Sequence, residues 1–184
     1  GEDPPRVYSF MNNLAGVLQQ QDRHEEALPL HEATHRFNRR VRGPRHPDTF
    51  MAANNLAGSL EGLGRYDEAE TLYLETLAGR REVLGDDHPA TIGSLNNLGF
   101  LYRNQGRRDR AEPLFREAWE RFRAALGAKH PNTLVAASNL GNLYNEMERF
   151  AEAAPINQEV LAGLREALPP DHWLVGTVLV RRGV

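Results

Sequence analysis

The sequence predicts an all-α solenoid of antiparallel helix pairs, and two observations carry this prediction. The first is a gapless internal repeat: His-Pro pairs recur at 46–47, 88–89 and 130–131, and His172 falls one period further on. The second is a helical spacing of apolar residues within each repeat. A period of 42 residues containing two short helices is typical of units that stack on one another, since neither helix can bury its apolar stripe alone.

The repeat register organises the whole chain, residues 1–184, as a single array. Four full repeats are predicted at about 4–45, 46–87, 88–129 and 130–171, with a partial fifth repeat at 172–184. Because this last unit stops within its first helix, we expect the parent protein to continue beyond Val184.

The third repeat illustrates the two predicted helices. The stripe of its first helix consists of Ile92, Leu95, Leu98, Gly99 and Tyr102. Pro89 suits the first helical position, and Gly106 suits a left-handed cap just past the end. The stripe of its second helix consists of Ala111, Leu114, Phe115, Ala118 and Phe122. Gly127 ends that helix. Arginines at the equivalent positions 39, 81, 123 and 165 fall in the last turns of the second helices, where the exposed carbonyl groups favour a cation.

The order of large and small residues in these stripes resembles the tetratricopeptide repeat. The residues that carry the resemblance are Leu95, Leu98, Gly99, Tyr102, Ala111, Phe115 and Ala118, and the linker REVLGDDHPATIGSLNNLG is similar to that of kinesin light chain and of many bacterial multidomain proteins. The resemblance extends from about Pro5 to Val184. It implies a right-handed solenoid that serves as a protein-binding scaffold, with a concave groove lined by the first helices that takes an extended peptide or a helix.

Composition narrows the classes of function. The net charge is −3, so no global basic field favours nucleic acid, and the chain has no cysteine to bind zinc or to form disulfides. The longest apolar run is too short to span a membrane, which leads us to expect a soluble, cytoplasmic protein with no cofactor. Lys129 is the only lysine among 22 basic residues, a bias that hints at a bacterial source.

A zinc-protease pattern, H-E-x-x-H, occurs at His31, Glu32 and His35. His31 shares a column with Tyr73 and Phe115, and His35 shares one with Leu77, Trp119 and Leu161. Both columns are predicted to face the core within a repeat, and no third ligand follows at the required spacing. We therefore expect no metal and no enzymatic activity, and keep a zinc-dependent hydrolase as a remote alternative.

The histidine ladder at 46, 88, 130 and 172 is predicted to act at helix N-termini, because stacked helices stand roughly 8–10 Å apart and cannot share one metal ion. Two arginine clusters, at 36–45 and 103–110, are interleaved with acids and predict a solvated surface or salt bridges between repeats. Among these arginines, only Arg103 is expected to project toward the groove.

Asparagines dominate the predicted groove. One column contains Asn12, Asn54 and Asn96, and a second contains Asn13, Asn55, Asn97 and Asn139; Phe100, Arg103, Asn104 and Asn142 complete the candidate partner-binding set. A side-chain amide has both donors and an acceptor, so this surface suits the main chain of a bound peptide. The alternative for Asn97 and its equivalents is that they hydrogen-bond neighbouring helices and hold the stack together.

We therefore expect a scaffold that binds a protein or peptide ligand. A second interpretation is a self-assembly module whose groove or C-terminal end is filled by another copy. The apolar segment at 173–180 would support such a homo-oligomer, with Trp173, Leu174 and Val178 as its contact residues.

Overall fold

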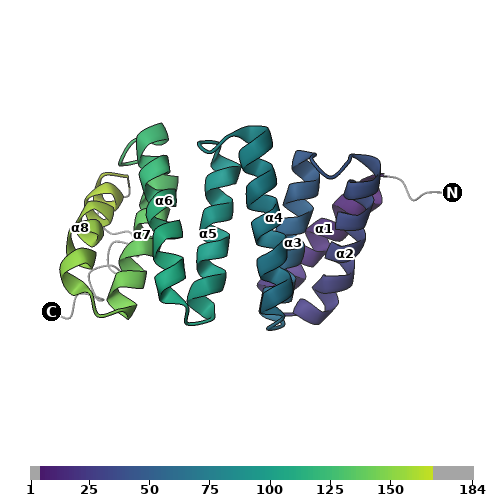
Figure 1. The fold of residues 1–184 in the computed structure, drawn as a ribbon, viewed down its shortest axis with the longest axis horizontal. Helices are drawn as coiled ribbons and strands as arrows, with labels where there is room; N and C mark the ends of the chain where they lie inside the picture. Colours follow the sequence, from purple (N-terminus) through teal and green to yellow (C-terminus); the bar gives the residue numbers. More distant parts are fainter. Residues whose placement is uncertain (1–4, 168–184) are drawn as a thin grey trace. The chain divides into compact units, whose positions relative to one another are not determined.

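The computed structural model describes residues 5–167, and this part of the chain folds into eight α-helices without a β-strand (Figure 1). In chain order they are α1 (Pro5–Gln20), α2 (His24–Val41), α3 (Pro47–Gly62), α4 (Tyr66–Leu84), α5 (Pro89–Asn104), α6 (Arg108–Leu126), α7 (Pro131–Glu146) and α8 (Phe150–Ala167). The first helices begin 42 residues apart, as do the second helices, and the predicted all-α repeat solenoid is confirmed. The candidate self-association residues Trp173, Leu174 and Val178 lie outside the described residues.

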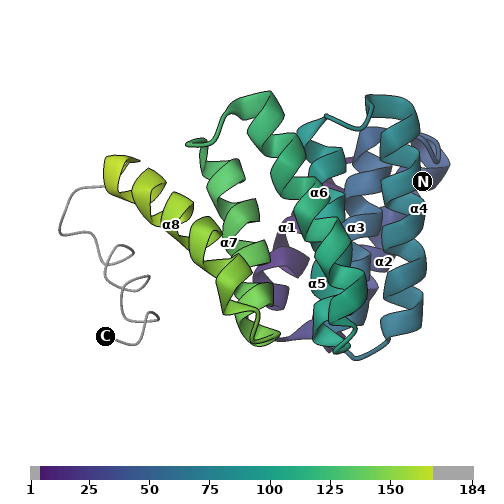
Figure 2. The same ribbon diagram turned by 60° about the vertical axis from the view of Figure 1, so that its left-hand side comes forward.

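The chain divides within α5 into two compact units, residues 1–101 and 102–184. In the first unit α2 packs on both α1 and α3, α4 packs on α3, and α1 also touches α3. In the second unit α7 packs between α6 and α8 (Figure 2). Within the described residues, no helix is both long and apolar enough to cross a membrane.

Histidines cap the first helices, as the sequence predicts. Nδ1 of His46 accepts a hydrogen bond from the backbone N–H of Asp48 at 3.1 Å, and His88 and His130 make the equivalent bond at the same distance. A proline follows each histidine at the first helical position, where its missing N–H costs nothing. One of the exposed amide groups at each of these helix starts is thereby satisfied.

The first helices end in a left-handed residue at four equivalent positions. Gly64 and Gly106 hold φ angles of 73° and 75°, which confirms the predicted cap at Gly106. At the same place in the outer repeats stand Asp22 and Glu148, with φ angles of 58° and 59°. A side chain in this conformation costs roughly 1 kcal/mol relative to glycine. The outer repeats therefore carry strain that the inner repeats lack.

Small residues let the helices approach closely. The alanine column at 27, 69, 111 and 153 is almost completely buried. Gly79 on α4 faces the ring of Phe50 on α3, and a Cβ atom added at Gly79 would lie 2.4 Å from Phe50 Cε1. Gly163 bears the same relation to Leu134 in the fourth repeat. A large residue on the first helix is thus matched by glycine on the second.

Each contact between a second helix and the following first helix, which we call a joint, contains a different polar group. In the α2–α3 joint, Nδ1 of His31 lies 2.9 Å from Oγ of Ser59. In the α4–α5 joint, the buried guanidinium of Arg80 donates to the carbonyl oxygen of Ala90 at 3.0 Å and to Oγ of Ser94 at 2.7 Å. Both groups would be costly to bury without these partners.

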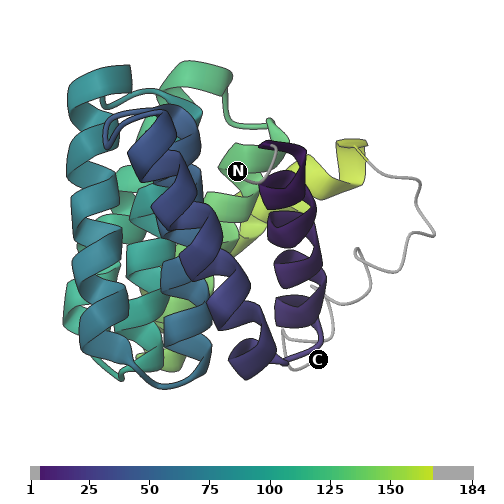
Figure 3. The same cartoon turned by 90° about the vertical axis from the view of Figure 1, so that its right-hand side faces the viewer.

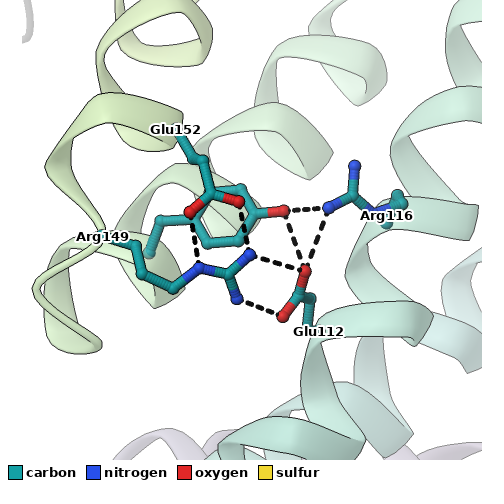
Figure 4. Close-up of polar contacts among 5 residues, drawn as sticks. Glu112, Arg116, Arg149 and Glu152 are labelled. Carbon is teal, nitrogen blue, oxygen red and sulfur yellow. Dashed lines mark hydrogen bonds and ion pairs between the residues drawn. The ribbon is translucent and has the colours of Figure 1, made fainter.

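The α6–α7 joint has a charged network (Figure 4). The carboxylate of Glu112 accepts hydrogen bonds from Arg116 at 3.0 Å and from the Tyr144 hydroxyl at 3.1 Å, and it also pairs with Arg149. Arg149 stacks over the Tyr144 ring at 4.5 Å and pairs with Glu152. The hydrogen bond from Arg149, with those from Arg116 and Tyr144, lowers the pKa of Glu112 against the opposing effect of burial.

Candidate functional site

The asparagines of the first unit form a staggered ladder. Nδ2 of Asn55 on α3 donates to Oδ1 of Asn12 on α1 at 3.0 Å, and Nδ2 of Asn97 on α5 donates to Oδ1 of Asn54 on α3 at 2.7 Å. The second column of one repeat therefore bonds the first column of the repeat before it. We call the surface formed by residues 12, 13, 54, 55, 96 and 97 the asparagine face.

At one end of this face lies a cleft of about 180 Å³ between α1 and α3. It is lined by Tyr8, Ser9, Asn12, Asn13, Thr34, Phe37, Asn38, Arg42, Asp48, Met51 and Ala52. The rings of Tyr8 and Phe37 stack with centroids 3.9 Å apart, so aromatic surface lines the cleft beside amide groups. Ser9, Asn13 and Met51 are exposed on its walls.

Polar contacts hold the α2 side of the cleft in place. Arg42 and Asp48 form an ion pair at 2.5 Å across the turn between α2 and α3. Nδ2 of Asn38 donates to the carbonyl oxygen of Asp48 at 3.3 Å, and Oγ1 of Thr34 donates to that of Leu30 at 2.8 Å. These contacts use the polar groups of α2 internally, which leaves the amides of α1 and α3 as the groups facing a ligand.

The candidate residues on α5 and α7 have mixed surroundings. Asn96, Phe100, Asn139 and Asn142 are half-buried, and Asn104 is exposed. In the second unit, Arg103 forms an ion pair with Glu146 at 3.3 Å, and Arg108 approaches the same carboxylate at 3.5 Å. The expected salt bridges of the arginine clusters are confirmed at these positions, at Arg42, and between Arg45 and Glu82 at 2.8 Å.

Sequence reasoning missed the α2 side of the cleft. Thr34, Phe37 and Asn38 belong to the second helix, whereas the groove was assigned to first helices alone. One signal was available: the column of Tyr8 contains Phe50, Ile92 and Leu134, and that of Phe37 contains Gly79, Arg121 and Gly163. Two aromatic residues therefore meet only in the first of these four pairs, and they stack at the cleft.

The zinc-protease pattern has a structural explanation. His31 is 1% exposed and bonds Ser59, while burial lowers its pKa. His35 is half-buried, and its pKa is lowered by burial and by Arg39, with Glu75 opposing. The predicted burial of His31 is confirmed, but its partner Ser59 lies on the first helix of the next repeat rather than in the core of its own repeat. Within residues 5–167, no group of three or more metal-ligating side chains is placed to hold an ion.

Comparisons with known proteins decide the family. The model of the tetratricopeptide repeat family matches residues 6–82, 48–118 and 91–166 in overlapping segments. The chain belongs to the tetratricopeptide repeat family. Such repeats generally mediate protein–protein interaction. No curated protein sequence matches the chain.

Several solved structures share the fold. A protein of P. anserina described as a kinesin light chain with nearly identical TPR-like repeats superposes with a TM-score of 0.82 at 22% identity, covering 96% of this chain and 84% of that one. BtubC of P. vanneervenii gives 0.77 at 22% identity, with coverages of 94% and 68%. A Rap protein complexed with competence and sporulation factor gives 0.79 at 15% identity, with coverages of 98% and 47%. At these identities the likeness concerns the tetratricopeptide fold alone.

Proposed function

We propose that this tetratricopeptide repeat protein binds an extended peptide segment of a partner protein along its asparagine face. The observation that carries the proposal is the ladder and the cleft beside it. In their bonds to Asn55 and Asn97, Asn12 and Asn54 use only their side-chain oxygens, so their NH₂ groups have capacity left for carbonyl groups of a ligand. The side-chain oxygens of Asn55 and Asn97 are in turn suited to accept from ligand N–H groups.

The spacing of the ladder fits an extended chain. First helices of successive repeats stand roughly 8–10 Å apart, and an extended peptide advances about 3.3 Å per residue. Successive asparagine rows then meet about every third residue of the ligand. The cleft between α1 and α3 is suited to one apolar side chain, which would lie against Tyr8, Phe37 and Met51.

The Rap protein seen with competence and sporulation factor gives this proposal a structural parallel. The self-assembly interpretation, in which another copy fills the groove or the C-terminal end, is the second candidate. The exposed apolar residues Phe10, Leu14 and Val17 of α1 offer a different surface for a second copy. Zinc-dependent hydrolysis through His31, Glu32 and His35 has no support, because His31 is buried against Ser59.

Selection from a random peptide library tests the proposal. Peptides enriched by the wild-type chain are measured by calorimetry against Asn12→Ala and Asn54→Ala, each of which is expected to weaken binding roughly five- to tenfold through loss of one hydrogen bond. Asn132→Ala is the matched control, since Asn132 is an exposed asparagine at the start of α7. Equal affinities for all four proteins would contradict binding at the asparagine face.

Salt dependence provides a separate prediction. The proposed contacts are made by amides rather than by charged groups, so raising the salt from 50 to 500 mM is expected to change the affinity less than about threefold. A titration of one enriched peptide at several salt concentrations measures this. A steep loss of affinity would instead implicate the arginine clusters.

A further inference from the structure

The first helix carries an exposed apolar stripe that has no counterpart in the later repeats. Phe10, Leu14 and Val17 are 72%, 54% and 51% exposed, and Val7 and Met11 extend the same surface. One period later, the equivalent residues Ala52, Leu56 and Ser59 are buried. Figure 3 looks onto this end of the first unit, with α1 and α2 nearest the viewer.

The chemistry of the stripe differs from that of the internal joints. In the internal joints, a polar side chain of a second helix bonds to a serine of the first helix of the following repeat. His31 bonds to Ser59, and Arg80 bonds to Ser94. In α1, the residues equivalent to these serines are Val17 and Phe10. The hydroxyl of Tyr144 forms hydrogen bonds with Glu112 and Arg116, and the residue equivalent to Tyr144 in α1 is Leu18. A second helix with such polar groups would bury them against α1 without a partner.

A surface that covers this stripe must therefore be apolar where it makes contact. It must also pack against large side chains, since the stripe has no small residues that would let a helix approach closely. A second copy of α1 satisfies both conditions. Its five stripe residues present the same neutral surface, and two aromatic side chains, one Phe10 from each copy, supply the kind of anchor that dominates protein interfaces. We propose that this chain forms a twofold dimer in which α1 packs against α1 of a second copy.

Charge sets the orientation of the two helices. Arg6 is the only charged residue in α1. The stripe is centred near residue 12, so in an antiparallel pair the two Arg6 side chains lie about 18 Å apart along the helix axes, whereas in a parallel pair they lie side by side. The antiparallel arrangement also opposes the two helix dipoles. The dimer is accordingly antiparallel, with Val7 of one copy opposite Val17 of the other.

The contact is small. A stable interface buries about 800 Å² on each partner, and one helix face offers less than that. The dimer is therefore weak and assembles in the range of roughly ten to several hundred micromolar.

Sedimentation equilibrium of the full chain over this range tests the dimer. Phe10→Glu is expected to raise the dissociation constant at least about tenfold by placing two carboxylates at the contact. Val135→Glu is the matched control, because Val135 is 59% exposed on another first helix and the charge change is the same. A wild-type chain that stays monomeric throughout, or a dimer abolished by Trp173→Glu and unaffected by Phe10→Glu, would overturn the proposal.

Cysteine cross-linking tests the geometry, since the natural chain has no cysteine. Oxidation of an equal mixture of Val7→Cys and Val17→Cys chains is expected to give the mixed disulfide. Val17→Cys alone is expected to cross-link at least tenfold more slowly, because two Val17 positions lie about 15 Å apart along the axes and a disulfide needs Cα atoms within about 7 Å. Rapid cross-linking of Val17→Cys alone would show a parallel pair and overturn the antiparallel dimer.

Discussion

Asp22 and Glu148 hold the left-handed backbone conformation that glycine holds at the equivalent positions of the inner repeats. The strain at each is local, since the turn around it has the same hydrogen bonds in all four repeats: the N–H of Arg149 bonds the carbonyl oxygen of Tyr144 at 2.9 Å, and that of Arg107 bonds Tyr102 at 2.8 Å. Substitution at these residues should therefore change stability without changing the fold.

Glu148→Gly is expected to stabilise the chain by about 0.5 kcal/mol. Relief of the left-handed strain gains roughly 1 kcal/mol, and the greater freedom of glycine in the unfolded chain offsets part of it. Urea denaturation measures the change. Gly106→Glu should destabilise by a similar or larger amount, and a Glu148→Ala variant, which stays strained, should show no gain; a gain equal to that of Glu148→Gly would refute the explanation.

His31 gives the α2–α3 joint a pH dependence. Burial lowers its pKa in the folded chain, so the unfolded chain binds the proton more readily. The contribution of neutral His31 to stability is complete above the unfolded pKa, near 6.5, and declines as the pH falls toward the folded pKa. We expect the free energy of unfolding to decrease between pH 7 and pH 5.

The variant His31→Phe/Ser59→Leu tests this, because it copies the Phe115 and Leu143 residues of the third and fourth repeats, which are both fully buried. Its unfolding free energy should fall less than that of the wild type over the same pH interval, with the other six histidines as a common background. Identical pH profiles would exclude His31 as the source.

At the scale of the helices, three of the four second helices contain a proline at their sixth residue: Pro29 in α2, Pro113 in α6 and Pro155 in α8. In α4 the equivalent residue is Thr71, whose hydroxyl donates to the carbonyl oxygen of Asp67 at 2.9 Å. All four side chains are exposed, so packing does not require proline there. Each proline removes one hydrogen bond to the residue four positions earlier.

Pro113→Thr is expected to stabilise the chain by about 1 kcal/mol. The restored backbone hydrogen bond and the relieved ring clash outweigh the loss of proline's restriction of the unfolded chain, which is worth roughly 0.4–1 kcal/mol. Thr71→Pro is the reciprocal variant and should destabilise α4. Thermal unfolding of both proteins measures the effect, and a lower melting temperature for Pro113→Thr would show that proline is needed at this turn.

The helix pattern and its caps could be predicted because they depend on residues close together in sequence. His46 and Gly106 act on their own helices, so their roles follow from position alone. The ladder bond from Asn55 to Asn12 agrees with the alternative role predicted for the second asparagine column, a hydrogen bond to a neighbouring helix. Its partner could not be predicted, because the offset of 43 residues depends on how α1 and α3 slide past each other. The exposed stripe of α1 was missed for a different reason. Leu14 and the buried Leu56 stand at equivalent repeat positions, and the repeat pattern does not show which first helix has no other helix packed over it.

At the scale of the whole molecule, the two units depend on different polar groups. The first contains the His31 and Arg80 joints, and the second contains the Glu112 network. The lowered pKa of Glu112 means that its contribution is complete above the unfolded pKa of about 4.5 and is lost as the pH falls through the folded pKa. The two units should therefore weaken in different pH intervals, the first once the pH falls below about 6.5 and the second once it falls below about 4.5.

Glu112→Gln tests the second interval. At pH 7 the variant should lose about 1–2 kcal/mol of stability, because Arg116, Arg149 and Tyr144 keep an acceptor but lose its charge. The difference from the wild type should shrink below pH 4, where Glu112 itself becomes protonated. Glu117→Gln, which weakens a half-buried pair with Arg121 on the same helix, should have a smaller effect, because a pair of neighbouring turns contributes only a few tenths of a kcal/mol. A constant difference down to pH 2 would contradict the assignment.

Because each joint contains a different polar group, the loss of a whole repeat by recombination would bring together two helices whose polar groups do not match. A deletion of 42 codons spanning residues 88–129 keeps the reading frame and the helix register, so the shortened product would look intact as a sequence. It would nevertheless set α4 against α7, where Ala136 occupies the place of Ser94, and the buried guanidinium of Arg80 would lose the hydroxyl it bonds. Repeats of equal length allow such a deletion without a change of frame, but the mismatched joint would destabilise its product.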